Sequence, residues 1–279
     1  MSKKNWLPKA LTQSLFILTL IILILPFMWT ILNSVKPSME VFVNSWWLPQ
    51  TVKWGNYVTA WVKNSISLGF VNTAIVTIIS LPLVLLLSAM ATFALTRLKF
   101  RGNSLILYLF VAGNMLPQAL ILIPLFIQLQ TLNILNIPYA SLILVYIAFG
   151  FPFHILVQAP FFHAVPHELE EAVYMDGGSV FDVFWKVNLP LAKSGIIIGG
   201  IFQFFYSWNE YIFAHTIVQS KELRTLPLTI GDLVLRQTYV ADWGSVFAGL
   251  VIALVPCFII YVVSQKHLTR GVLMGALKG

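Results

Sequence analysis

Long stretches of this sequence contain no charged residue, and they constrain its fold more than any other feature. A transmembrane helix needs about 20 consecutive, mostly apolar residues. Charge-free stretches long enough for this cover residues 10–35, 64–96, 102–167 and 243–265, and the stretch 194–220 contains a single acidic residue. Only 10% of the 279 residues are charged, against roughly 25% in soluble domains. The chain is therefore expected to cross a membrane several times.

The stretch 102–167 is too long for one helix, and residues 132–138 divide it with two asparagines and a proline. One helix is expected on each side of this break. The fold class predicted from the sequence is thus all-α, a polytopic membrane protein with six transmembrane helices. They are placed near residues 11–33, 68–95, 105–131, 139–160, 194–218 and 245–265.

Lysines and arginines are distributed unequally between the two sides of such a membrane protein. Six spans put both termini on one side, which would hold eleven cations: Lys3, Lys4, Lys9, Arg97, Lys99, Arg101, Lys186, Lys193, Lys266, Arg270 and Lys278. The other side would hold six: Lys36, Lys53, Lys63, Lys221, Arg224 and Arg236. The positive-inside rule then predicts cytoplasmic termini. The net charge of +7 reflects this topology, so membrane lipid and no nucleic acid is expected as a partner.

The loop at residues 166–190 carries half of the ten acidic residues of the chain. Pro166 can begin a helix, and Gly177-Gly178 can end it. Ser179 and Asp182 have the spacing of a capping box for a second helix, which Pro190 helps to stop. An acidic loop gains nothing from the anionic inner leaflet, so its charges are expected to meet basic residues on a protein. A solvated amphipathic linker is the alternative.

The same loop resembles the cytoplasmic signature of permease subunits from binding-protein-dependent ABC importers. That signature runs Glu-Ala-Ala, three residues, Gly, nine residues, Ile-x-Leu-Pro, and here it reads Glu171-Ala172-Val173, Gly177 and Val187-Asn188-Leu189-Pro190. Val173 and Val187 are mild departures. Residues 34–38, 96–102 and the tail 265–279 resemble the carbohydrate type of this family, of the maltose permease kind.

This resemblance implies a type I ABC importer permease fold with a cytoplasmic coupling helix. The whole chain, 1–279, would be one transmembrane permease domain, with an N-terminal helix and first outer loop at 1–66 and the core spans and coupling loop at 67–279. It would lie in a bacterial or archaeal cytoplasmic (inner) membrane. The expected partners are a second, unlike permease subunit, two copies of an ATP-binding subunit and an extracytoplasmic sugar-binding protein.

The resemblance also implies that ATP is hydrolysed elsewhere. A phosphate-binding loop contains a Gly-Lys pair, which this sequence lacks, so the chain is expected to be a non-catalytic subunit that binds no cofactor itself, with ATP and Mg on its ATPase partners. The coupling helix would sit in a cleft of the ATPase. The residues predicted to dock there are Glu170, Glu171, Ala172, Met175, Asp176, Gly177 and Arg270.

Polar side chains inside the predicted spans form the second candidate site. Such groups are costly in lipid and usually face a cavity or another helix. Six are candidates for the solute pathway or for the interface with the other permease: Asn114, Gln118, Gln203, Tyr206, Asn209 and Glu210. No metal site is expected, because Pro166 interrupts the helix that would place His163 and His167 on one face.

Other functions remain open from the sequence. A permease for a non-sugar solute, such as a peptide or an osmolyte, would share the loop signature. An ion-coupled secondary transporter or a channel would explain the spans and Glu210 equally well, but it would not explain the acidic loop. A membrane-embedded enzyme would need a convergent set of catalytic groups, and the sequence offers none.

Overall fold

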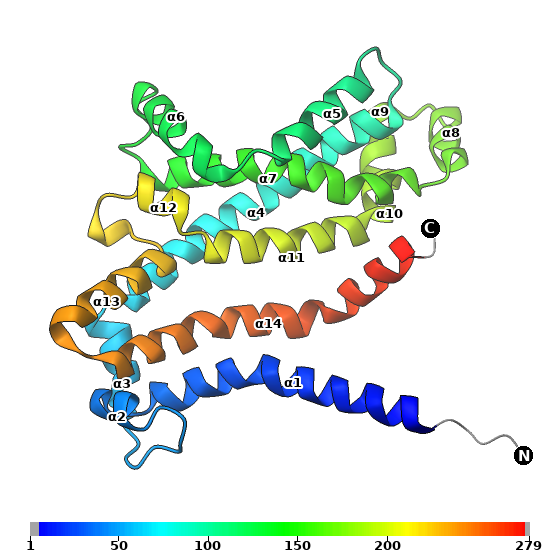
Figure 1. Cartoon of the computed structure of the whole chain (residues 1–279). Coiled ribbons are helices and arrows are strands. Elements are labelled where there is room, and N and C mark those ends of the chain that lie inside the picture. Colours follow the sequence, from blue (N-terminus) through cyan, green and yellow to red (C-terminus); the bar gives the residue numbers. More distant parts are fainter. Residues whose placement is uncertain (1–5, 277–279) are drawn as a thin grey trace, which may run out of the picture. The chain divides into compact units, whose positions relative to one another are not determined.

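The protein is built from helices (Figure 1). The computed structural model describes the backbone of residues 6–276, and side chains for residues 11–237 and 239–266. No strand occurs in this described backbone, and the predicted all-α fold is confirmed. The chain forms two compact units. Unit 1 comprises the described residues up to Ser67 together with Thr229–Val255, and unit 2 comprises Leu68–Leu228 together with the chain from Pro256 onward.

Unit 1 holds the first long helix and the turns that follow it. Its elements are α1 (Trp6–Ser34), α2 (Ser38–Val43), α3 (Gly55–Val58), η1 (Thr59–Lys63), most of α13 (Leu226–Val240) and the first part of α14 (Trp243–Ala276). The Trp29 ring packs edge-on against Phe247, with 5.0 Å between ring centroids. The buried Asn56 amide donates hydrogen bonds to the carbonyl oxygens of Ser34 and Lys36, at 2.9 and 2.8 Å. These bonds fasten the chain where it leaves α1.

Unit 2 contains both candidate sites. Its elements are α4 (Ile66–Arg97), α5 (Asn103–Asn114), α6 (Gln118–Thr131), α7 (Pro138–His163), α8 (His167–Met175), α9 (Val180–Asp182), η2 (Val183–Asn188), α10 (Leu189–Leu191), α11 (Lys193–Asn209), α12 (Ile212–Ile217) and η3 (Lys221–Leu223). Helix α7 packs along α11 and also contacts α5 and α12. At Gly195 a side chain would collide with the ring of Phe161, so the glycine lets α11 approach α7 closely.

Four helical segments in the described chain are long and apolar enough to cross a membrane: Leu11–Ser34, Ile66–Arg97, Pro138–His163 and Trp243–Lys266. Two bent helix pairs raise the number to six if each pair counts as one span. These four unbroken helical segments coincide with the predicted first, second, fourth and sixth spans. Their outward faces carry large apolar side chains, as Phe16 and Ile78 do, which suits contact with lipid or with partner helices.

The third predicted span is not a continuous helix. Helices α5 and α6 meet at an angle of 102° across a break of three residues. Pro117 stands at this break in an extended conformation and precedes α6 as its N-cap. Because a proline disfavours helical geometry in the residue before it, a helix running through residues 105–131 was the wrong expectation.

The fifth predicted span, 194–218, is also interrupted. Helix α11 ends at Asn209, Glu210 is extended, and the shorter α12 begins at Ile212. Helix α11 is bent by 71° from the segment Val180–Leu191 that precedes it. Helix α13, with 15 residues between the last two predicted spans, was not predicted from the sequence.

Candidate functional site

Helix α8 begins and ends at the residues that the sequence indicated. Pro166 precedes it in an extended conformation, and Glu168 and Glu170 occupy its first turn, where the positive end of the helix dipole favours acidic groups. Gly177 ends it with φ of +76°, a left-handed conformation that glycine adopts without steric cost. The amides of Gly177 and Gly178 then donate to the carbonyl oxygens of Tyr174 and Val173, at 3.0 and 2.8 Å. The two donors satisfy carbonyl groups at the helix end.

The predicted capping box after this turn is confirmed. The Asp182 carboxylate accepts the Ser179 amide at 2.8 Å, and the Ser179 hydroxyl accepts the Asp182 amide at 3.3 Å. The Lys186 ammonium lies 2.6 Å from the same carboxylate. Hydrogen bonds from Lys186 and from Ser179 hold the pKa of Asp182 well below its ordinary value. The cap therefore stays charged at neutral pH.

Glu170 does not lie on the free surface of α8. Its Oε1 atom accepts the Nε–H of Arg97 at 2.6 Å and the side-chain amide of Asn188 at 2.8 Å. The side chain of Glu170 is 10% exposed and that of Arg97 is 2% exposed. Glu170 was predicted to dock with the ATPase, but its carboxylate is turned inward, where it neutralises a buried guanidinium. The role of Arg97 as the partner of Glu170 was not predicted, because an arginine at the end of a span was interpreted only as evidence of membrane topology.

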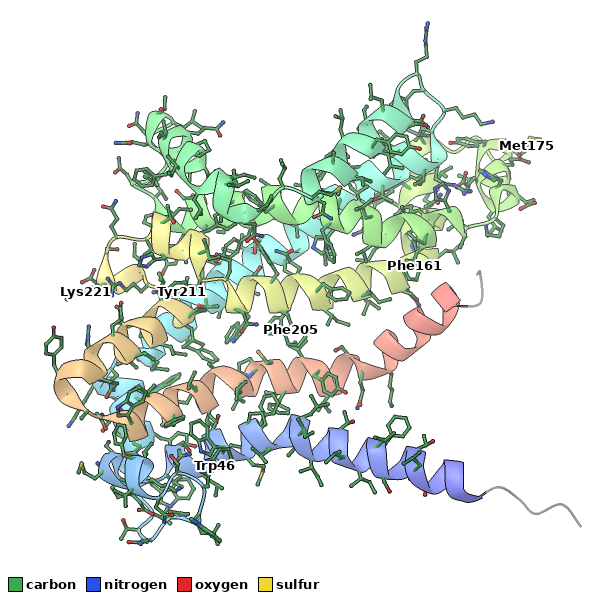
Figure 2. All side chains as sticks on the ribbon, viewed as in Figure 1. Trp46, Phe161, Met175, Phe205, Tyr211 and Lys221 are labelled. Carbon is green, nitrogen blue, oxygen red and sulfur yellow. The ribbon has the colours of Figure 1, made fainter. Side chains whose placement is uncertain are left out.

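The opposite face of α8 is exposed, and most of the predicted docking residues lie there or at the helix end. Glu171, Ala172, Met175, Asp176 and Gly177 are all exposed. Met175 is 87% exposed, and Figure 2 labels it at the edge of unit 2. Leu169 adds a second apolar side chain, 44% exposed. The backbone of Arg270 belongs to α14, but its side chain lies outside the described residues.

Four of the six polar residues predicted inside the spans line one cavity. Asn114, Gln118, Gln203 and Tyr206 enclose about 280 Å³ together with four further residues, Phe149, Gly150, Phe153 and Phe202. We name this cavity the aromatic–amide pocket. The bend between α5 and α6 carries Asn114 and Gln118, while α7 and α11 supply the other residues. The phenylalanines were missed, because nothing in the sequence separates a pocket-lining phenylalanine from one that faces lipid.

Hydrogen bonds fix the polar side of the aromatic–amide pocket. The Gln118 amide donates to the Tyr206 hydroxyl at 3.4 Å. The Gln203 side-chain oxygen lies 2.8 Å from His154 Nε2. The side-chain NH2 group of Gln203 donates to the Ser207 hydroxyl at 3.0 Å. An amide oxygen only accepts, so this contact is a hydrogen bond in the tautomer that has the His154 proton on Nε2. A side chain at Gly150 would lie 2.7 Å from the Gln203 oxygen, so the glycine leaves room for this arrangement.

Glu210 and Asn209 do not line the aromatic–amide pocket. The Glu210 carboxylate is buried and accepts the backbone amides of Phe213 and Ala214, at 2.6 and 3.0 Å. It also accepts the Tyr146 hydroxyl at 2.8 Å. Glu210 thus caps α12 from inside unit 2, since its carboxylate satisfies amide groups at the start of that helix. Asn209 is exposed and donates to the carbonyl oxygen of Phe205.

Comparison with known proteins places these sites in a family. The model of the binding-protein-dependent transport system inner membrane component matches residues 85–274, which include both the 166–190 loop and the aromatic–amide pocket. The chain belongs to this family. The permease is accordingly a multi-pass membrane component of an ABC transporter.

Individual relatives match the permease over almost its whole length. A probable ABC transporter permease protein of Bacillus subtilis is 36% identical over 262 residues, which cover 94% of this chain and 86% of the relative. The diacetylchitobiose uptake system permease protein of Streptomyces coelicolor is 34% identical, with 96% and 89% covered. The trehalose transport system permease protein of Mycobacterium tuberculosis is 29% identical, with 92% and 93% covered.

A solved structure shares the fold of the permease. It is the crystal structure of a bacterial ABC transporter involved in the import of the acidic polysaccharide alginate, with a TM-score of 0.82. The match covers 95% of this chain and 98% of the other at 20% identity. The predicted ABC importer permease fold is therefore confirmed.

Proposed function

We propose that the permease is the transmembrane subunit of an ATP-driven sugar importer and forms half of its solute pathway. Its partners would be a second, unlike permease subunit, two copies of an ATP-binding subunit and an extracytoplasmic sugar-binding protein. Relatives named for diacetylchitobiose and trehalose transport support carbohydrate as the solute class. The observation that carries the proposal is the two-sided α8, which is anchored on one face and open on the other.

The exposed face of α8 is the proposed docking surface for the ATPase. Glu171 supplies charge, Ala172 permits close approach, and Met175 offers an apolar contact, while Asp176 and Gly177 form the adjoining turn. ATP and Mg belong to the partner subunits in this proposal, and domain closure there would displace α8. Arg270 stays a prediction as a further contact.

Purification of the assembled complex tests this proposal. Mild detergent extraction should recover a second permease and an ATP-binding subunit, and a sugar-loaded binding protein should stimulate their ATPase. In the Glu171→Lys variant we expect the ATPase to dissociate or to lose this stimulation. Glu222→Lys is the control, because it makes the same charge change at an exposed residue of η3. Normal stimulation and uptake in Glu171→Lys would refute the docking role.

The aromatic–amide pocket is the proposed pathway element of this subunit. Amide groups both donate to and accept from sugar hydroxyls, and aromatic rings cover the apolar faces of sugar rings. None of the eight described residues that line the cavity is charged, which suits a neutral sugar. We therefore assign Asn114, Gln118, Gln203 and Tyr206 to the pathway rather than to the permease interface.

Substitution of two pocket residues separates these roles. Gln118→Ala and Tyr206→Phe each remove a hydrogen-bonding group from the cavity, and the second keeps the aromatic ring. We expect slower sugar transport by complexes that still contain both permeases and still show stimulated ATPase. Asn209→Ala, a change outside the pocket, should leave transport unchanged. Loss of the second permease from the purified Gln118→Ala or Tyr206→Phe complexes would instead support the interface role.

A further inference from the structure

A buried polar cluster joins α8 to three other segments of unit 2. Arg97, the last residue of α4, donates from Nε to Glu170 at 2.6 Å and from Nη2 to the Val165 carbonyl oxygen at 3.0 Å. A longer contact of 3.5 Å reaches the carbonyl oxygen of Phe162 in α7. Asn188 of η2 donates to the same Glu170 oxygen at 2.8 Å. We name Arg97, Glu170 and Asn188 the α8 clamp.

The clamp resists displacement of α8 relative to the ends of α4 and α7 more strongly than a single contact would. A guanidinium group has five donors in a rigid plane, so bonds to a carboxylate and to main-chain carbonyl oxygens fix its position and its orientation. Both charges are almost fully buried. Separating them would leave an uncompensated charge away from water, which is strongly unfavourable.

An apolar cluster adjoins the clamp and connects the same segments. Ala89 and Phe93 of α4, Phe162 of α7 and Phe184 of η2 are buried in it, and Val173 of α8 packs against it. The rings of Phe93 and Phe184 lie 5.4 Å apart between centroids. Glu170 and Val173 are three residues apart, so they share one face of α8. That face is anchored at two points, while Glu171 and Met175 are left on the other.

We propose that the α8 clamp makes α8, the end of α4 and the end of α7 move as one body. A displacement of α8 would then move the long helix α4 with it, instead of only bending the short connection at residues 164–166. Arg97 and Glu170 are positioning residues in this scheme, since they act through α8 and touch no substrate. The inference rests on the proposed docking of an ATPase at α8.

A double variant tests the clamp without leaving an unpaired buried charge. Arg97→Met combined with Glu170→Met replaces the ion pair by apolar groups, a type of change that is often tolerated in folding. In proteoliposomes with the complete complex, we expect assembly and ATP hydrolysis to persist. Sugar transported per ATP hydrolysed should fall by about tenfold or more, a size typical of coupling between sites. An unchanged ratio would overturn the proposal.

Two further variants separate positioning from general stability. Lys186→Gln removes an exposed charge in the same loop while it keeps the Ser179–Asp182 capping box, and it should leave the transport ratio unchanged. Arg97→Lys keeps the charge but cannot make all the contacts of the guanidinium, so it should give an intermediate ratio. A drop in the amount of complex with a normal ratio per complex, for either clamp variant, would show a merely structural role and overturn the proposal.

Hydrogen exchange distinguishes failure of the clamp from failure of the proposed function. In the wild-type complex without ATP, the amides of α8 should be protected, and the double methionine variant should exchange them about tenfold faster while α11 stays unchanged. Unchanged α8 exchange would overturn the clamp whatever the transporter carries. A wild-type complex with no stimulated ATPase would refute the proposed function, while faster α8 exchange would still support the clamp.

Discussion

At the scale of single residues, the buried carboxylates Glu170 and Glu210 each accept hydrogen bonds from groups within unit 2. Glu210 shows this most clearly, because its carboxylate accepts two backbone amides and one tyrosine hydroxyl while it is shielded from solvent. A buried donor that loses its acceptor costs about 1–3 kcal/mol. The role of Glu210 is therefore expected to lie in the stability of the α11–α12 break.

Glu210→Ala should destabilise the permease by roughly 2–4 kcal/mol, because the two amides and the Tyr146 hydroxyl lose their acceptor together. Glu210→Gln should cost less, since an amide oxygen can still accept. Thermal unfolding in detergent, followed by tryptophan fluorescence, measures both effects. Asn209→Ala is the matched control at an exposed neighbour. If Glu210→Ala unfolds at the wild-type temperature but releases the second permease, Glu210 serves the interface.

Lys36 is another buried charged residue, located after α1 in unit 1. Its ammonium donates to the carbonyl oxygens of Asn44 and Ser45, at 2.7 and 3.1 Å. Burial lowers the pKa of Lys36 below 10.5, and the nearby Glu40 opposes this in part. The unfolded chain therefore binds more protons than the folded chain between the lowered pKa and 10.5.

The contribution of Lys36 to stability should rise with pH through that alkaline window. The sign follows from the lowered folded-state pKa, because raising the pH removes a charge that burial disfavours. Thermal unfolding measured at several alkaline pH values should show this rise in the wild type. Lys36→Met should remove that part of the pH dependence, whereas Lys53→Met, at an exposed lysine, should retain it. Identical pH profiles for wild type and Lys36→Met would contradict the prediction.

At the scale of elements, α8 has one anchored face and one exposed face. The turn that ends the helix fixes the orientation of these two faces. The left-handed turn at Gly177 ends the helix directly after its last exposed docking residues. The capping box at Ser179 then starts the next helix within two residues. A longer or looser turn would let α8 rotate and would turn Glu171 away from its exposed side.

Gly177→Ala should destabilise this turn by about 1–2 kcal/mol, the cost of a left-handed conformation for a residue with a Cβ atom. The penalty is conformational, because nothing lies within 4 Å of the position where that Cβ would be. Gly177→Asn should cost less, since asparagine tolerates this conformation better. Hydrogen exchange at the amides of residues 174–178 measures the change. Equal protection in Gly177→Ala and wild type would argue against a strained turn.

At the scale of the whole molecule, the charge distribution predicts which loops face the cytoplasm. The prediction places the 166–190 loop inside and the loop before residue 63 outside. Both loops carry an exposed residue that can be replaced by cysteine for labelling, Phe181 in the 166–190 loop and Trp47 in the outer loop, and neither belongs to the proposed docking surface. Cys257 is the single cysteine of the chain, so one substitution removes the background.

In a Cys257→Ser background, Trp47→Cys should react with a membrane-impermeant thiol reagent added to intact cells. Phe181→Cys should react only after the membrane is opened, because its loop is predicted to face the cytoplasm. Mass spectrometry of the labelled permease measures both reactions. The reverse pattern would invert the predicted topology and would exclude docking of a cytoplasmic ATPase at α8.

The sequence alone determined the all-α class, four of the six spans and both ends of α8. These features depend on local properties: runs without charge, a proline before a helix, a glycine after it, and the Ser179–Asp182 spacing. It also indicated the family, because the loop signature is a contiguous pattern. The break at Pro117 and the helix α13 were not predicted, although a proline is a possible sign of a helix boundary.

Only the tertiary structure decided which partner each polar side chain meets. Glu170 and Glu171 are adjacent and chemically alike, yet one neutralises Arg97, 73 residues earlier, and the other faces outward. In the same way, Asn114 and Tyr206 come together in one cavity while Glu210 caps a helix. Local patterns specify helices and their ends, whereas these pairings depend on how helices distant in the chain pack against one another.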